Sequence, residues 1–103
     1  MRFQLTPAFD GDWERLSTNE RAKFRDVVRK QFHPACERRR GDPASPWPNS
    51  LHVRDVEGAP GIWEMTGSFA GPDGRATFEW IAIDGEPAIR WRRIGGHAIF
   101  ERG

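Results

Sequence analysis

Residues 88–100, Ala-Ile-Arg-Trp-Arg-Arg-Ile-Gly-Gly-His-Ala-Ile-Phe, are the stretch around which the rest of the chain can be arranged. Its first part alternates apolar and basic side chains, namely Ile89, Arg90, Trp91 and Arg92. This period-two pattern is typical of a β-strand with one buried face and one solvent-exposed face. The alternation breaks at Arg93-Ile94, and Gly95-Gly96 then permit backbone conformations with positive φ. The stretch predicts a strand over 88–94 with His97 held just beyond its end.

Three segments upstream also have the composition of β-strands, and they cover residues 51–56, 62–69 and 75–83. Glycine- and proline-rich separators lie between consecutive strand segments, at residues 58–61, 71–74 and 84–87. Separators of this length and composition favour tight hairpin turns. Together these patterns predict a four-strand antiparallel meander over residues 51–94.

The predicted sheet has one apolar and one polar face. The apolar face carries Leu51, Val53, Trp63, Met65, Phe78, Trp80, Ile89 and Trp91. The polar face carries His52, Arg54, Glu64, Thr66, Thr77, Glu79, Arg90 and Arg92. Two interpretations of the polar face stay open: a network of cross-strand ion pairs, or a cleft that binds a charged ligand.

The N-terminal part of the chain predicts a short strand over 1–5 followed by a helical hairpin. Thr6-Pro7 combine a hydroxyl N-cap with a proline in the first helical turn. They begin a short helix whose apolar side chains are Phe9, Trp13 and Leu16. Ser17 and Glu20 form a capping-box pattern at the start of the second helix. The apolar face of that helix consists of Phe24, Val27, Val28 and Phe32.

Pro34 sets the expected end of the second helix. Proline disfavours the α conformation of the residue before it, so we expect the regular helix to end near His33. Residues 38–49 contain three arginines and a proline-rich run, and they are expected to form one long loop. With the hairpin packed on the apolar face, the prediction is a single α+β domain over residues 1–103.

Composition limits the possible functions of the chain. A net charge of +1 argues against tight nonspecific binding of nucleic acid by the whole protein. Residues 21–40, however, contain eight basic and two acidic side chains, which leaves room for contacts with phosphate or an acidic partner. A lone Cys36 excludes an internal disulfide. No apolar run of membrane length and no signal-peptide pattern is present, so we expect a cytoplasmic protein without membrane contact.

The order of elements and the Gly-x-His-x-x-Phe ending resemble the RelE/ParE superfamily of bacterial type II toxins. Three stretches are similar to its strand signatures: Pro-Gly-Ile-Trp-Glu-Met at 60–65, Asp-Gly-Arg-Ala-Thr-Phe at 73–78 and Arg-Arg-Ile-Gly-Gly-His at 92–97. The ending is most similar to the YafQ-like branch, which carries a Gly-Thr-His motif. The resemblance implies either a nuclease that cuts mRNA, typically on the ribosome, or a ParE-like inhibitor of DNA gyrase. In both cases a cognate antitoxin encoded nearby is the expected partner.

The resemblance also assigns expected roles to individual residues. It implies that His97 is a catalytic residue, that Arg75 stabilises the reacting phosphate and that Asp73 is an additional acid. Phe100 matches the aromatic residue near the C-terminus of the family and is expected to contact the substrate. The remaining candidates for substrate binding lie on the polar face, and they are His52, Arg54, Arg90 and Arg92.

These residue types suit RNA cleavage without a metal ion. The reaction needs a base for the 2′-hydroxyl, a cation for the phosphate and an acid for the leaving oxygen. A histidine, with an ordinary pKa of about 6.5, can serve as base or acid, and the planar fork of an arginine binds two phosphate oxygens. The three histidines and Cys36 lack the spacing of a zinc site, so no metal or other cofactor is expected. Two functional classes stay open: a metal-independent mRNA endoribonuclease, and a noncatalytic gyrase inhibitor or degenerate toxin-fold binding module.

Overall fold

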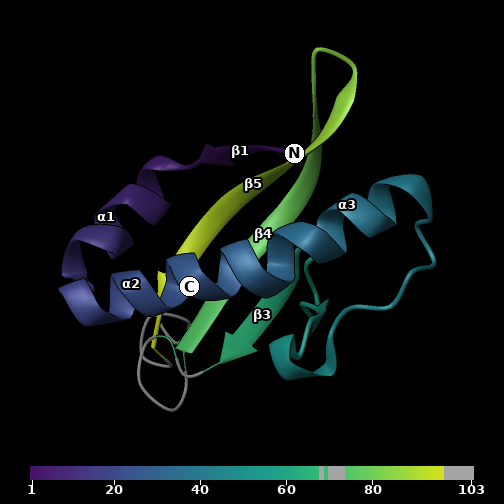
Figure 1. Ribbon diagram of the computed structural model, residues 1–103. Coiled ribbons are helices and arrows are strands. Elements are labelled where there is room, and N and C mark those ends of the chain that lie inside the picture. Colours follow the sequence, from purple (N-terminus) through teal and green to yellow (C-terminus); the bar gives the residue numbers. More distant parts are fainter. Residues whose placement is uncertain (68, 70–73, 97–103) are drawn as a thin grey trace.

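The computed structural model describes residues 1–67, 69 and 74–96, and Figure 1 shows the arrangement of their helices and strands. The first part contains β1 (Arg2–Leu5), α1 (Pro7–Arg15), α2 (Thr18–Val27), the π-helical segment η1 (Val28–Phe32) and α3 (His33–Gly41). The second part contains the 3₁₀ turn η2 (Asn49–Leu51), β2 (Arg54–Asp55), β3 (Trp63–Gly67), β4 (Gly74–Ile83) and β5 (Glu86–Gly95). The α+β class expected from the sequence is confirmed.

The strands form one five-stranded mixed sheet in the order β1-β5-β4-β3-β2. β2 to β5 pair antiparallel in chain order, which confirms the predicted meander. The predicted N-terminal strand is also present, and it pairs parallel with β5, with Phe3 opposite Ile89 and Leu5 opposite Trp91. The chain thus places its first strand beside its last one, because the intervening segments provide the long crossover that a parallel pair requires.

Local capping chemistry sets the start of both helices in the hairpin. The Thr6 hydroxyl accepts a hydrogen bond from the backbone N–H of Phe9, with Pro7 in the first turn of α1. Ser17 and Glu20 form a complete capping box at the start of α2, in which each side chain accepts a hydrogen bond from the other residue's backbone N–H. Both starts agree with the sequence prediction, because each cap satisfies N–H groups that have no partner inside the helix.

The core lies between the apolar face of the sheet and the continuous helical rod formed by α2, η1 and α3, which crosses that face (Figure 1). The ring of Phe24 lies 5.2 Å from that of Trp91, centroid to centroid. Phe32 lies 4.9 Å from Phe78 and 4.7 Å from Trp91. All four side chains are buried. The predicted packing of the second helix on the aromatic face of the sheet is therefore confirmed.

The predicted end of the second helix near His33 is wrong, because helical backbone continues to Gly41. The residue before Pro34 keeps a right-handed helical conformation, with φ −59° and ψ −47°. Its N–H bonds the carbonyl of Val28, five residues earlier, in a π-helical turn that changes the hydrogen-bond pattern just ahead of the proline. Ala35 and other side chains of the following turn are fully buried, so tertiary packing favours continuing the rod over ending it.

The arginine run at 38–40 consequently lies in the last turn of α3 and not in a loop, as the sequence had suggested. Arg40 forms an ion pair with Glu86 at the start of β5. Arg39 donates to the carbonyl of Ser45, and its guanidinium lies 4.8 Å from the ring centroid of Trp47. Two of the three arginines are thus engaged within the molecule. No helix within the described residues is long and apolar enough to cross a membrane.

Two strands begin two or more residues away from the start that the sequence predicted. The segment expected over 51–56 contains only the two-residue strand β2, because Leu51 belongs to η2 and His52 has a left-handed backbone with φ 48°. In the hairpin between β4 and β5 the turn consists of Asp84 and Gly85. Both residues have positive φ, and β5 begins at Glu86. Two central residues with positive φ match the right-handed twist of the strands that they join.

A β-bulge interrupts the pairing of β4 with β5. Trp91 is still in the regular register, whereas Arg93 lies opposite Thr77, so Arg92 is the additional residue on β5. The break in alternation therefore begins one residue earlier than predicted. A bulge changes the direction of the side chains that follow it, and Ile94, three residues after Trp91, is buried as well.

Candidate functional site

The polar face of the sheet carries two groups of opposite charges on neighbouring strands. The first group consists of Arg54, Glu64 and Arg75 on β2, β3 and β4. The Glu64 side chain, only 9% exposed, accepts a hydrogen bond from Arg54 Nε and has its second oxygen 3.7 Å from Arg75 Nη1. One nearly buried carboxylate therefore holds two guanidinium groups at this end of the sheet.

The second group lies further along the sheet and consists of Glu79, Arg90 and Arg92. Arg90 Nη1 lies 2.7 Å from one oxygen of Glu79, and Arg92 Nη1 lies 3.2 Å from the other. Arg90 Nε also donates to the side-chain oxygen of Gln4 on β1, at 2.7 Å. This group therefore connects the three strands β1, β5 and β4.

The ion-pair interpretation of the polar face is confirmed by these contacts. The second group contains two guanidinium groups and, among the described residues, a single carboxylate. A face that holds its arginines in place is suited to binding an anion, because the side chains lose little conformational freedom when the ligand arrives.

Arg75 is the candidate residue whose strand pairing bears most directly on the site. It lies opposite Gly95 of β5 in the register, at the last residue of that strand. His97 follows Gly95 by two positions in the sequence. The predicted phosphate-stabilising arginine and the strand end that leads to the predicted catalytic histidine are thus direct neighbours in the sheet. His97, Asp73 and Phe100 themselves lie outside the described residues.

His52 does not occupy the position that the sequence predicted. It was placed on the polar face of a strand, but it follows η2 in a left-handed conformation and is exposed. Its backbone N–H donates to the carbonyl of Asn49, but within the described part of the chain its side chain forms no hydrogen bond or ion pair, unlike that of Arg54 two residues later. The structure therefore brings Arg54 and Arg75 together through Glu64 and leaves His52 outside this group.

Sequence reasoning missed a buried carboxylate, Asp12 of α1, whose side chain is 1% exposed. It accepts hydrogen bonds from Arg93 Nε at 2.7 Å, from Arg93 Nη2 at 3.0 Å and from the backbone N–H of Ile94 at 3.1 Å. The hydrogen bonds to Asp12 raise the pKa of Arg93 above its ordinary value. The sequence did carry a signal, because Asp12 occupies the same helical stripe as Phe9 and Leu16. A carboxylate on an apolar stripe needs a buried partner.

The Asp12 contacts fasten α1 to the end of β5. They hold the two residues that directly precede Gly95-Gly96, at the same end of the sheet as Arg75. The position of the segment that leads to His97 therefore depends on a helix that is more than 80 residues away in the sequence. Asp12 is in this sense a positioning residue for the candidate site.

The described residues contain no group of three or more histidine, cysteine, aspartate or glutamate side chains that could hold a metal ion. Cys36 is fully buried in α3. Burial, followed by the charge of Glu37, raises the pKa of the Cys36 thiol to about 12. The thiol is therefore protonated at neutral pH, which makes it a poor nucleophile and a poor metal ligand.

Comparison with known proteins gives evidence about the fold. No family model matches the chain, and no curated protein matches it. Among solved structures, it is similar to the solution structure of the conserved hypothetical protein HP0894 from Helicobacter pylori. The two share 14% sequence identity with a TM-score of 0.54, and the match covers 95% of this chain and 96% of the other. Nearly the whole chain thus shares its fold with a protein from Helicobacter pylori.

Proposed function

We propose that this protein is the toxin of a type II toxin-antitoxin pair of the RelE/ParE superfamily, and that it cleaves mRNA in the cytoplasm without a metal ion. The pairing of Arg75 with Gly95 is the observation that carries the proposal. It puts the backbone of Arg75 directly beside the strand end from which His97 follows. The motif resemblance and the α+β fold with its four-strand meander agree with the same assignment.

In the proposed reaction, His97 exchanges a proton with the 2′-hydroxyl or with the leaving 5′-oxygen. Arg75 stabilises the negative charge that accumulates on the phosphate in the transition state. Glu64 orients Arg75 from the side opposite to the substrate, because its carboxylate is nearly buried and already lies 3.7 Å from Nη1. Asp73 would act as an additional acid, in keeping with the histidine-bearing branch.

The flanking arginines would hold the RNA chain. Arg54 is exposed beside Arg75, and the pair Arg90 and Arg92 lies further along the same face. Contacts of this kind position phosphates without reading sequence. Phe100 would contribute an aromatic surface for a base. The two groups therefore give a path for an RNA backbone along the polar face.

A second candidate function, a noncatalytic inhibitor of gyrase or a degenerate toxin-fold binding module, is favoured by two observations. Glu64 and Glu79 each neutralise part of the arginine charge on the face that would bind the substrate. The chain also contains no tyrosine, which removes one acid or base that such nucleases use. In either case a cognate antitoxin encoded nearby is the proposed partner.

The test is to induce wild type, His97→Ala and Arg75→Ala in bacteria, and to map RNA 5′ ends and DNA breaks in the same cultures. We expect the purified His97→Ala protein to cleave about 10²–10⁴-fold more slowly and Arg75→Ala about 10²–10³-fold more slowly. Arg75→Ala should keep a melting temperature close to that of wild type, because Arg75 does not belong to the hydrophobic core. Thermal melting of His97→Ala checks that this variant is folded as well. Chelators should leave wild-type cleavage unchanged.

Arg2→Ala is the matched control, because it removes an exposed arginine that is ion-paired with Asp84 at the far end of the sheet. Its cleavage rate should equal that of wild type. Equal toxicity of wild type and His97→Ala, with intact mRNA and gyrase-linked DNA breaks, would contradict the nuclease and favour the inhibitor. Growth unaffected by any of the proteins would favour the degenerate binding module.

A further inference from the structure

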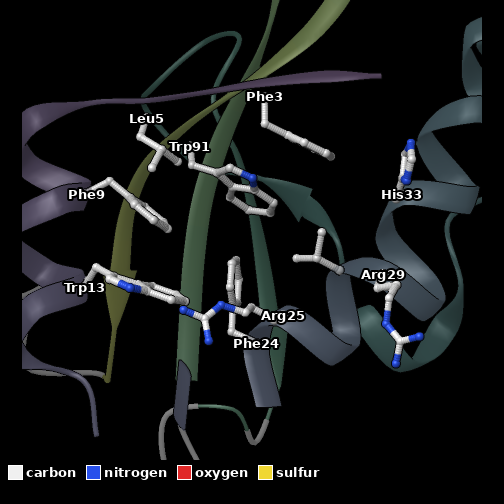
Figure 2. A pocket seen from close by; sticks show the side chains of 10 residues that line it. Phe3, Leu5, Phe9, Trp13, Phe24, Arg25, Arg29, His33 and Trp91 are labelled. Atoms are coloured by element: carbon white, nitrogen blue, oxygen red, sulfur yellow. The ribbon is translucent and has the colours of Figure 1, made fainter. Parts of the chain in front are cut away.

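A pocket of about 380 Å³ lies on the face of the sheet opposite to the polar face, between β1, α1 and the helical rod (Figure 2). Its apolar lining consists of Phe3, Leu5, Phe9, Trp13, Phe24, Val28 and Trp91. Trp91 forms the floor, and the other rings and the leucine surround it (Figure 2). The pocket has no part in the proposed cleavage of RNA, because its residues differ from those of the candidate site.

The pocket exposes apolar side chains that a small domain would normally bury. Phe3 is 38% exposed and Leu5 is 49% exposed, and both lie on the edge strand β1, which pairs with β5. Phe9 of the neighbouring helix α1 is buried, whereas these two side chains stay exposed. An exposed apolar concavity of this kind is typical of a ligand site.

The polar groups that line this pocket are two arginines and a histidine, Arg25, Arg29 and His33. The guanidinium of Arg25 lies 5.2 Å from the ring centroid of Trp13, and it has no carboxylate partner among the described residues. Arg29 shares the carboxylate of Asp26 with Lys30, at 3.1 Å and 3.0 Å. No acidic side chain belongs to the pocket lining.

The helical rod beside the pocket also carries more basic than acidic side chains. Residues 18–33 contain five basic and two acidic side chains, which gives a formal charge of +3 beside the pocket. Arg25 in particular is held at the mouth by its contact with Trp13, so little conformational freedom would be lost on binding an anion. The pocket therefore combines an apolar floor with a prepositioned cation.

We propose that this pocket binds a small amphipathic carboxylate, with its aliphatic chain or aryl ring over Trp91 and its carboxylate at Arg25. The guanidinium of Arg25 can donate two hydrogen bonds to one carboxylate. The volume lies within the range of about 300–1,000 Å³ that is typical of small-molecule sites. A cationic ligand would meet Arg25 and Arg29.

Decanoate is the probe for this site, used well below the concentration at which it forms micelles. We expect it to perturb the indole N–H resonances of Trp13 and Trp91 in the full-length protein and to change the tryptophan fluorescence. Decylamine, which has the same chain and the opposite charge, should bind at least about tenfold more weakly. Binding of both probes with equal affinity would overturn the role of Arg25.

Arg25→Gln is the variant that isolates the charge, and Lys23→Gln is its control. Lys23 is an exposed cation on the same helix, outside the pocket lining. We expect Arg25→Gln to weaken decanoate binding by about tenfold to a hundredfold and Lys23→Gln to leave it unchanged. Arg25 is exposed, so the variant should keep its fold, and thermal melting checks this. Unchanged affinity in Arg25→Gln would overturn the proposal.

Leu5→Ser tests the apolar half of the site, and it should weaken decanoate and decanol alike. Two further outcomes would contradict the small-ligand assignment. If the wild type is a dimer in sedimentation and Leu5→Ser is a monomer, the pocket is an interface between two copies. If decanoate has no effect on the two indoles but a peptide of alternating leucine and glutamate perturbs them, the pocket is a protein-docking groove.

Discussion

Two acid-arginine groups end on β5, and they differ in where their carboxylate lies. Asp12 is 1% exposed and binds Arg93 together with a backbone N–H, whereas Glu79 is 21% exposed and binds Arg90 and Arg92 on the open face of the sheet. Solvent screens the second group and not the first. The same pair of residue types therefore serves as a structural fastening at one place and lies on an exposed surface, where we propose that it binds an anion, at the other.

The buried group should show the largest effect on stability. We expect Asp12→Ala to lower the free energy of unfolding by about 3–5 kcal/mol, because it leaves a partly buried guanidinium and the N–H of Ile94 without an acceptor. Urea unfolding followed by tryptophan fluorescence measures the change. Asp12→Asn, which keeps the shape and one oxygen acceptor, should cost less. A loss below about 1 kcal/mol in Asp12→Ala would show that water replaces the carboxylate, and that the two groups are energetically alike.

The exposed group should show a smaller effect, and one that depends on salt. We expect Glu79→Ala to lower the free energy of unfolding by less than about 1 kcal/mol, because Arg90 and Arg92 are then solvated. The difference from wild type should shrink further between low salt and about 1 M salt. The same variant should strengthen binding of a single-stranded RNA, since it removes the carboxylate between two arginines. Weaker RNA binding would mean that Glu79 positions these arginines for the ligand.

The smallest expected change is in the chemical reactivity of Cys36. This buried thiol reacts when the core opens, so its reaction rate can be compared in both variants. Because burial raises the pKa of its thiol to about 12, the thiolate does not form in the folded protein as the pH passes 9. In the unfolded chain the same thiol has a pKa of about 8.5. The free energy of unfolding therefore decreases as the pH rises from that value towards 12. Ellman's reagent should therefore react slowly with wild type and Glu79→Ala at pH 9, and faster with Asp12→Ala. Rapid reaction of the wild type would contradict the buried position of Cys36.

Residues near one another in the sequence were predicted well. The caps at Thr6 and Ser17, the antiparallel meander and the aromatic face that receives Phe24 and Phe32 all agree with the structure. Each depends on hydrogen bonds or on a periodicity within a few residues. The polar face was also located, and the ion-pair network on it was one of the two interpretations considered.

Interactions between distant segments account for what was missed. Pro34 was expected to end the helix, but the π-helical turn before it and the buried turn after it continue the rod. The parallel pairing of β1 with β5 has no local signal. Asp12 does lie on the apolar stripe of α1, but nothing local identifies its partner Arg93, which is 81 residues away. For the candidate site, the sequence identified Arg54 and Arg75 but not the nearly buried Glu64 as the residue that joins them.

The sequence by itself determined the elements and their faces, because capping, turn formation and alternation depend on a few neighbouring residues. Only the tertiary structure decided which charges are buried, which strand closes the sheet beside β5, and where a pocket stays open between β1, α1 and the rod. The physical reason is that desolvation and packing depend on what covers a side chain. In this fold the covering group comes from the other end of the chain, as the contact between Asp12 and Arg93 shows.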